Sequence, residues 1–116
     1  MTFRLALAAL ATAAAALFHN HLVKSAPNDG EKLATAPTEV RLWFNERPEI
    51  PFTSITLLTS DSTRIASIKA VATADSLAVS ARLPAQLPAG GYVVLWRSAS
   101  SDGHAIRGRF GFTIAP

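Results

Sequence analysis

The 116-residue sequence contains no cysteine, and its only methionine is Met1. The lack of cysteine excludes disulfide bridges, thiolate metal ligands and a cysteine nucleophile. The lack of internal methionine also removes the soft sulfur ligand that favours Cu(I). The fold must therefore be held by an apolar core, and the length corresponds to one domain that is large enough to bury one.

An excess of charge of one sign is also absent. The net charge is +3, and because Arg4 is the only charged residue among positions 1–18, the rest of the chain carries +2. The basic residues are scattered along the sequence. This bias is too small to indicate a nucleic-acid partner, and we expect none.

A long apolar run occurs only at the beginning, where Arg4 precedes an Ala/Leu-rich stretch that ends before His19. A membrane-spanning helix needs about 20 apolar residues, whereas the apolar core of a signal peptide has about 7–15. The segment predicts a signal peptide over residues 1–18 and export of the chain. The alternatives are an uncleaved anchor and a helix packed in the domain.

The cleavage site is expected near residues 16–18. Ala14 and Ala16 supply the small side chains that favour a cut after Ala16, which leaves two residues ahead of His19. A cut directly before His19 places Phe18 at a position that favours a small residue. The two positions differ in one chemical respect, since only the second gives His19 a free α-amine.

After residue 18, short segments alternate apolar and polar residues with a period of two, as half-buried strands do. Turn residues separate these segments at intervals of about 8–12 residues. The pattern predicts an all-β fold, an immunoglobulin-like Greek-key β-sandwich of about seven strands over residues 19–116. Because proline is excluded from central strands, the segment 50–52 around Pro51 is expected to cross between the sheets or lie at an edge. The residues expected on buried faces are Val40, Leu42, Phe44, Ile55, Leu57, Leu77, Val79, Ala81, Leu83, Phe110, Phe112 and Ile114.

Three histidines are the main candidates for chemistry. His19 and His21 are two residues apart, so in a strand both point to the same face. Asp102 and His104 flank Gly103 in a polar loop, where glycine lets the backbone turn both side chains toward one point. Imidazole and carboxylate donors match the preference of Cu(II), and Zn(II) or Ni(II) accept the same groups.

Each of these motifs also has an interpretation without a metal. The His19–His21 segment is consistent with a solvated tail, and the loop with a turn closed by the Asp102 side chain. Ser100 and Ser101 lie beside Asp102 and His104, but the pattern of a nucleophile elbow is missing, which argues against a serine hydrolase.

Taken together, the segments resemble the CopC family of periplasmic copper-binding proteins. The likeness covers nearly all of the chain after residue 18, and its most specific part is the Trp96–Arg97 strand followed by the Ser-Asp-Gly-His loop. The segments that carry it are residues 19–30, 37–46, 87–97, 101–104 and 108–112.

The resemblance implies a periplasmic Cu(II)-binding protein that acts in copper sequestration, trafficking or resistance and is not an enzyme. By motif position, the copper ligands are His19, through its imidazole and free α-amine, together with Asp102 and His104. If Leu17 and Phe18 remain, His19 is a simple imidazole donor and His21 is an alternative ligand. Trp96 either reports copper by fluorescence quenching or is a plain core residue.

The lack of a methionine-rich loop indicates the Cu(II)-only branch of the family. The resemblance further implies a membrane copper-import protein as partner, and we expect a monomer. Two other functions remain in view. One is a metal-free sandwich that serves as an interaction module, and the other is a copper-dependent oxidative enzyme with an N-terminal histidine site.

Overall fold

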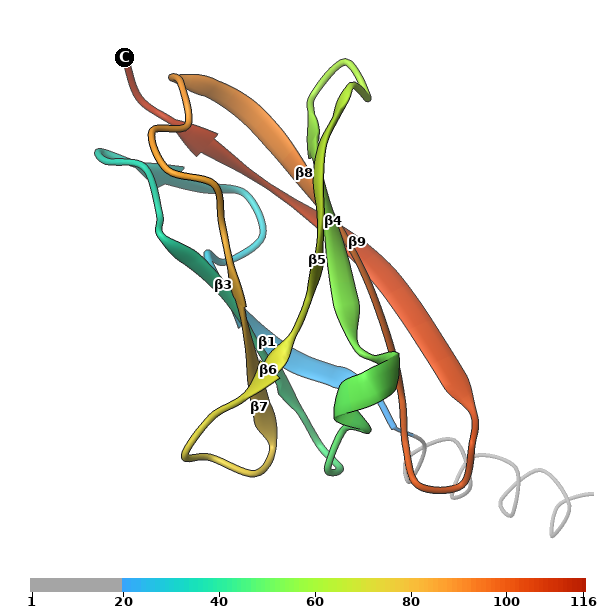
Figure 1. Cartoon of the computed structure of the whole chain (residues 1–116). Helices are drawn as coiled ribbons and strands as arrows, with labels where there is room; N and C mark the ends of the chain where they lie inside the picture. The colour runs from blue at the N-terminus through green and yellow to red at the C-terminus, as the bar shows by residue number, and fades with distance from the viewer. Residues whose placement is uncertain (1–19) are drawn as a thin grey trace, which may run out of the picture.

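The structure is a computed structural model that describes residues 20–116. Within that range the chain forms nine strands and one 3-10 helix, and it has no α-helix (Figure 1). The elements are β1 Leu22–Ala26, β2 Glu31–Leu33, β3 Glu39–Phe44, η1 Ile50–Phe52, β4 Ser54–Thr59, β5 Arg64–Lys69, β6 Val71–Ala72, β7 Ala78–Arg82, β8 Gly90–Ala99 and β9 Ala105–Ile114.

The strands form two sheets, which confirms the predicted all-β sandwich. One sheet has the order β1-β3-β7-β6, and the other has the order β2-β9-β8-β4-β5. Neighbouring strands are antiparallel except β2, which runs parallel to β9. The 3-10 helix η1 connects β3 of the first sheet to β4 of the second, so the segment 50–52 crosses between the sheets as predicted.

The core lies between the sheets and follows the expected alternation. Val40, Leu42 and Phe44 on β3 are at most 1% exposed, and the residues that alternate with them are partly exposed. Trp96 on β8 packs edge-on against Phe44, with ring centroids 5.7 Å apart and planes at 71°. This contact joins the two sheets near one end, and burial of these large apolar side chains is the main source of stability.

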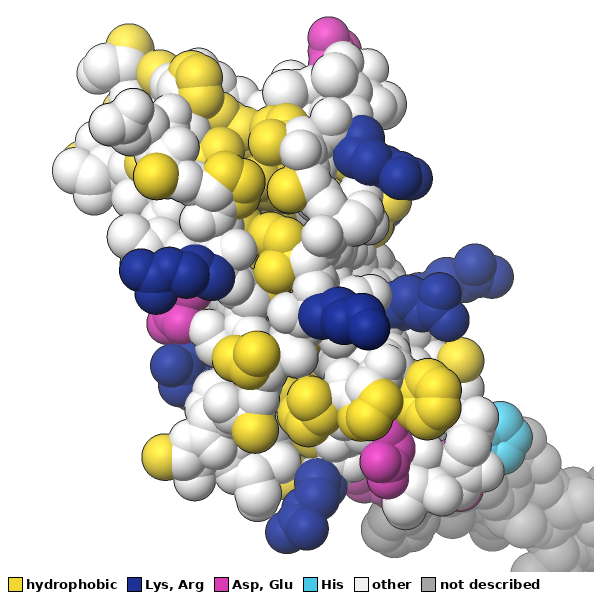
Figure 2. All heavy atoms as spheres, viewed as in Figure 1, with side chains coloured by type: hydrophobic (Ala, Val, Ile, Leu, Met, Phe, Trp, Pro, Cys, Tyr) yellow, Lys and Arg dark blue, Asp and Glu magenta, His cyan; other side chains and the backbone are white. Residues whose placement is uncertain are grey.

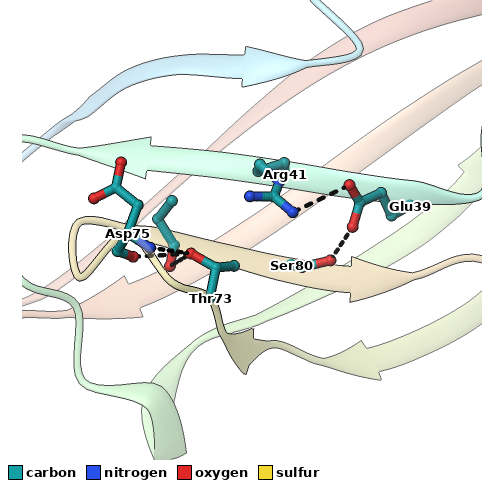
Figure 3. A network of polar contacts seen from close by, with 6 residues as sticks. Glu39, Arg41, Thr73, Asp75 and Ser80 are labelled. Carbon is teal, nitrogen blue, oxygen red and sulfur yellow. Dashed lines mark hydrogen bonds and ion pairs between the residues drawn. The ribbon is translucent and has the colours of Figure 1, made fainter.

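The prediction that Leu77 lies on the buried face is wrong. Its side chain is 39% exposed, and β7 begins only at Ala78. The carboxylate of Asp75 accepts the backbone N–H of Leu77 at 2.9 Å. The hydroxyl of Thr73 donates to the carbonyl of Asp75 at 2.8 Å (Figure 3). These side-chain bonds hold residues 73–77 in a turn, so the strand starts later than the apolar pattern suggests.

In the part of the chain that the structure describes, no helix is long and apolar enough to span a membrane. The signal peptide predicted over residues 1–18 lies outside the described residues.

Candidate metal centre

A tight loop joins the two longest strands, β8 and β9, at one end of the sandwich (Figure 1). The N–H of Gly103 donates to the carbonyl of Ser100 at 2.9 Å, which closes a turn over residues 100–103. Gly103 has φ +84°, a left-handed conformation that favours glycine and commonly ends a short hairpin loop. The hairpin thus fixes the backbone on both sides of the turn.

The loop brings Asp102 and His104 into direct contact. Nδ1 of His104 lies 3.0 Å from Oδ2 of Asp102. The backbone N–H of His104 also donates to Oδ1 of Asp102 at 3.0 Å. This bond closes the turn through the Asp102 side chain, as expected for a loop that needs no metal. The two side chains are 60% and 77% exposed, respectively, so an incoming ion can reach both of them.

This contact alters the protonation of both groups. Hydrogen bonds from His104 and from the Ser100 hydroxyl hold the pKa of Asp102 well below its usual range. The Asp102 carboxylate in turn raises the pKa of His104 above the usual 6.5. Because Nδ1 faces Asp102, Nε2 is the ring nitrogen that remains available to a further ligand.

Ser100 forms hydrogen bonds with both Asp102 and His104. It is only 3% exposed, its hydroxyl donates to Oδ1 of Asp102, and its N–H donates to the carbonyl of His104 at 3.4 Å. The sequence pattern suggests Ser100 only as a nucleophile and does not predict this positioning contact. The spacing Ser-X-Asp in a short loop was the available signal, since such side chains commonly bond to each other across one residue.

His21 does not join Asp102 and His104 in a common cluster. Its backbone N–H donates to Oδ1 of Asn45 at 2.6 Å, and its carbonyl accepts the N–H of Asn45 at 3.2 Å. No three His, Cys, Asp or Glu side chains within residues 20–116 come close enough to hold a metal. Because β1 begins at Leu22, His21 precedes the strand. The rule that residues two apart in a strand point to the same face therefore does not apply to it. His19 lies outside the described residues.

Trp96 is a core residue. It is 8% exposed, and besides Phe44 it contacts Gly108 on the neighbouring strand, where a β-carbon would meet the indole ring at 2.6 Å. Trp96 lies two positions before the buried Ser98 on β8, so it belongs to the strand and not to the loop that follows it.

Comparison with known proteins identifies relatives along almost the whole described chain. A family model described as CopC domain matches residues 22–115. The chain is 33% identical over 114 residues to copper resistance protein C of Escherichia coli, an alignment that covers 90% of this chain and 88% of that protein. It is 32% identical over 97 residues to copper transport protein CutJ of Bacillus subtilis (strain 168), which covers 83% of this chain but only 18% of CutJ.

Two solved structures share the fold at similar identity. The crystal structure of CopC from Methylosinus trichosporium OB3b superposes with a TM-score of 0.78 at 33% identity, over 84% of this chain and 95% of that one. PcoC, a methionine-rich copper resistance protein from Escherichia coli, gives 0.71 at 32% identity, over 83% and 98%. These names describe copper transport and copper resistance proteins and no enzyme, which agrees with the expectation of a non-enzymatic protein.

Proposed function

Because the chain belongs to the CopC domain family, we propose that it binds Cu(II) in the periplasm and acts in copper sequestration, trafficking or resistance. The observation that carries the proposal is the exposed Asp102–His104 pair, with its 3.0 Å contact, on a loop fixed by Gly103 and Ser100. One imidazole and one carboxylate are half of the four-donor N,O set that Cu(II) prefers.

His19 completes the proposed donor set. It directly precedes Asn20, and the described chain begins at the end of the sandwich that carries the β8–β9 loop (Figure 1). If cleavage leaves His19 first, its imidazole and α-amine provide two nitrogens, and with Asp102 and His104 the four donors are assembled.

The donor set fits copper as cargo. All the proposed donors are nitrogen or oxygen, and the sequence after Met1 contains no cysteine or methionine. Such a set favours Cu(II) over Cu(I), and copper lies at the top of the Irving–Williams order among divalent ions. An exposed loop site also permits transfer, and the receiving partner we propose is a membrane copper-import protein that meets this monomeric domain.

The proposal is tested by titrating Cu(II) into the exported protein against a competing chelator, with the EPR spectrum recorded and the N-terminus determined by mass spectrometry. We expect one copper per chain and a tetragonal, nitrogen-rich spectrum. The variant His104→Ala should bind copper more than about 100-fold more weakly, because a ligand contributes more than the outer-shell groups that cost 10–100-fold.

His21→Ala is the matched control, since it removes a histidine two residues from His19 and leaves Asp102 and His104 in place. It should retain the wild-type affinity within a few-fold when His19 is the first residue. Absence of binding by the wild type would leave a metal-free sandwich that serves as an interaction module. Equal affinity in wild type and His104→Ala would move the copper site away from the loop.

A further inference from the structure

The outward face of the five-stranded sheet collects cations that the linear sequence scatters. Lys69 on β5, Arg97 on β8, and Arg107 and Arg109 on β9 are all exposed. The strand register places Lys69, Ser54, Arg97 and Arg107 in one row across β5, β4, β8 and β9. Arg109 follows in the next row, opposite Leu95.

No acidic side chain occupies an outward position of these four strands. The ion pairs found within residues 20–116 are Arg41–Glu39 and His104–Asp102, which lie elsewhere. Arg97 and Arg107 are direct cross-strand partners, an arrangement of like charges that weakens a sheet. Glu49 lies at the end of this face, where it lines a hollow together with Arg97. The face as a whole is therefore complementary to an anionic partner.

Apolar side chains are exposed among these cations. Phe52, in η1, is 62% exposed and lines a hollow together with Lys69 and Arg97. Leu95 is 38% exposed and lines a groove with Thr56, Arg97, Arg107 and Arg109. Figure 2 shows Lys and Arg side chains over the region of β4, β5 and β9, with hydrophobic side chains exposed near them. We call the set Phe52, Lys69, Leu95, Arg97, Arg107 and Arg109 the basic face.

We propose that the basic face docks the domain onto the anionic lipid headgroups of a membrane surface. Elements that bind a membrane surface combine Lys and Arg with Phe and Leu, because the cations pair with headgroups while the apolar groups enter the boundary below them. An acidic protein that pairs with the same cations is the alternative partner, and the binding experiments distinguish the two. The open face spans four strands, and this breadth suits a continuous surface better than a single small anion.

Docking would also orient the candidate metal loop. Three of the four cations belong to β8 and β9, whose connecting loop carries Asp102 and His104. Phe52 and Arg97 line one hollow with Ser100 and Gly103 of that loop. The basic face, which binds the membrane in this proposal, is thus continuous with the β8–β9 loop. This inference does not depend on copper binding, because the basic face contains none of the proposed ligands.

The test is co-sedimentation of the protein, as recovered from the expressing cell, with vesicles of phosphatidylcholine that contain about a third phosphatidylglycerol. Binding to pure phosphatidylcholine vesicles measures any contribution from the apolar segment 1–18. Each cation near an anionic surface raises partitioning about fivefold. The double variant Arg97→Gln/Arg107→Gln should therefore bind the anionic vesicles roughly 25-fold more weakly than the wild type.

The matched control is Lys24→Gln/Arg82→Gln, which removes the same charge from the four-stranded sheet. It should bind within about twofold of the wild type, and Phe52→Ser should weaken binding at high salt, where the electrostatic part is screened. Equal losses in the two double variants would mean attraction by net charge alone and would overturn the proposal. Binding of a poly-glutamate peptide but not of anionic vesicles, with loss in Arg97→Gln/Arg107→Gln, would assign the face to an acidic protein instead.

Discussion

Among single residues, Ser100 shows how the candidate site is supported from within the fold. Its side chain is 3% exposed while its hydroxyl donates to the exposed carboxylate of Asp102. A buried donor restricts the rotation of that carboxylate at no cost to its exposure. Groups that orient metal ligands in this way typically contribute a factor of 10–100 in affinity. Ser100 is therefore a positioning residue for the proposed copper site.

Ser100→Ala should weaken Cu(II) binding by about 10–100-fold, since Asp102 loses the bond that fixes it. The pKa of Asp102 should also rise, because the Ser100 hydroxyl stabilises its charged form. Chelator competition measures the first effect, and NMR titration of the copper-free protein measures the second. Ser101→Ala is the control, since Ser101 is the exposed neighbour. If Ser101→Ala and Ser100→Ala bind copper equally well, Ser100 has no positioning role.

The sequence predicted that the Asp102 and His104 side chains turn toward one point, but it did not predict the contacts that support them. A carboxylate and an imidazole on either side of a glycine form a local pattern, and the chain places them 3.0 Å apart. The contact between Asn45 and His21 joins residues 24 positions apart. Such a contact depends on the pairing of β1 with β3, and neither residue alone indicates it.

At the level of strands, β9 depends on a close approach to β8. Gly108 is the cross-strand partner of Trp96, and an added β-carbon would lie 2.6–2.9 Å from three atoms of the indole ring. The indole ring of Trp96 also packs against the ring of Phe44, so it has little room to move. The absence of a side chain at residue 108 is thus a packing requirement.

Gly108→Ala should lower the free energy of unfolding by about 1–3 kcal/mol, the usual cost of overpacking a core. Thr113→Ala in the same strand is the control, because Thr113 is exposed and its loss should change stability by no more than about 0.5 kcal/mol. Urea unfolding followed by far-ultraviolet circular dichroism measures both. An unfolding free energy unchanged by Gly108→Ala would show that the indole ring can be displaced freely.

The apolar pattern predicts a strand correctly where buried and exposed residues alternate over five or more positions. It misses strands that are too short to show this alternation. In β4, residues 54–59, Ile55 and Leu57 are buried as expected and alternate with partly exposed residues. The strands β2 and β6 have three and two residues, too few to show a period, and they raise the number within residues 20–116 to nine. At Ala78 and Val79 two successive residues are buried, so the alternation is broken at the start of β7.

For the whole domain, acid stability is linked to Glu39, which joins β3 to β7. The Ser80 hydroxyl donates to Glu39, and Arg41 lies 3.4 Å from the other carboxylate oxygen (Figure 3). The bond from Ser80, aided by the charge of Arg41, holds the pKa of Glu39 below the usual 4.5. A lowered pKa in the folded state stabilises the fold above pH 4.5, and this contribution is lost as the pH falls through the folded-state pKa.

Glu39→Gln should therefore be less stable than the wild type near pH 7, and the difference should vanish in acid. Because the Glu39 side chain is 43% exposed, solvent screens the interaction, and a difference of about 0.2–1 kcal/mol is expected. Urea unfolding at several pH values between neutral and strongly acidic measures the difference. A gap that stays constant with pH would show that the charge of Glu39 makes no contribution.

Copper should act on the whole molecule through binding linkage. A ligand that binds only the folded state stabilises it by about 2.7 kcal/mol at a free concentration 100 times its Kd. For a domain of this size that corresponds to a rise in Tm of about 10–20 °C. Scanning calorimetry should show this rise with Cu(II), and a chelator should reverse it. His104→Ala should have nearly the wild-type Tm without copper, since its side chain is 77% exposed, and should show little rise with copper. An equal rise in both proteins would mean that copper binds elsewhere on the fold, and a fall in both would mean that it prefers the unfolded chain.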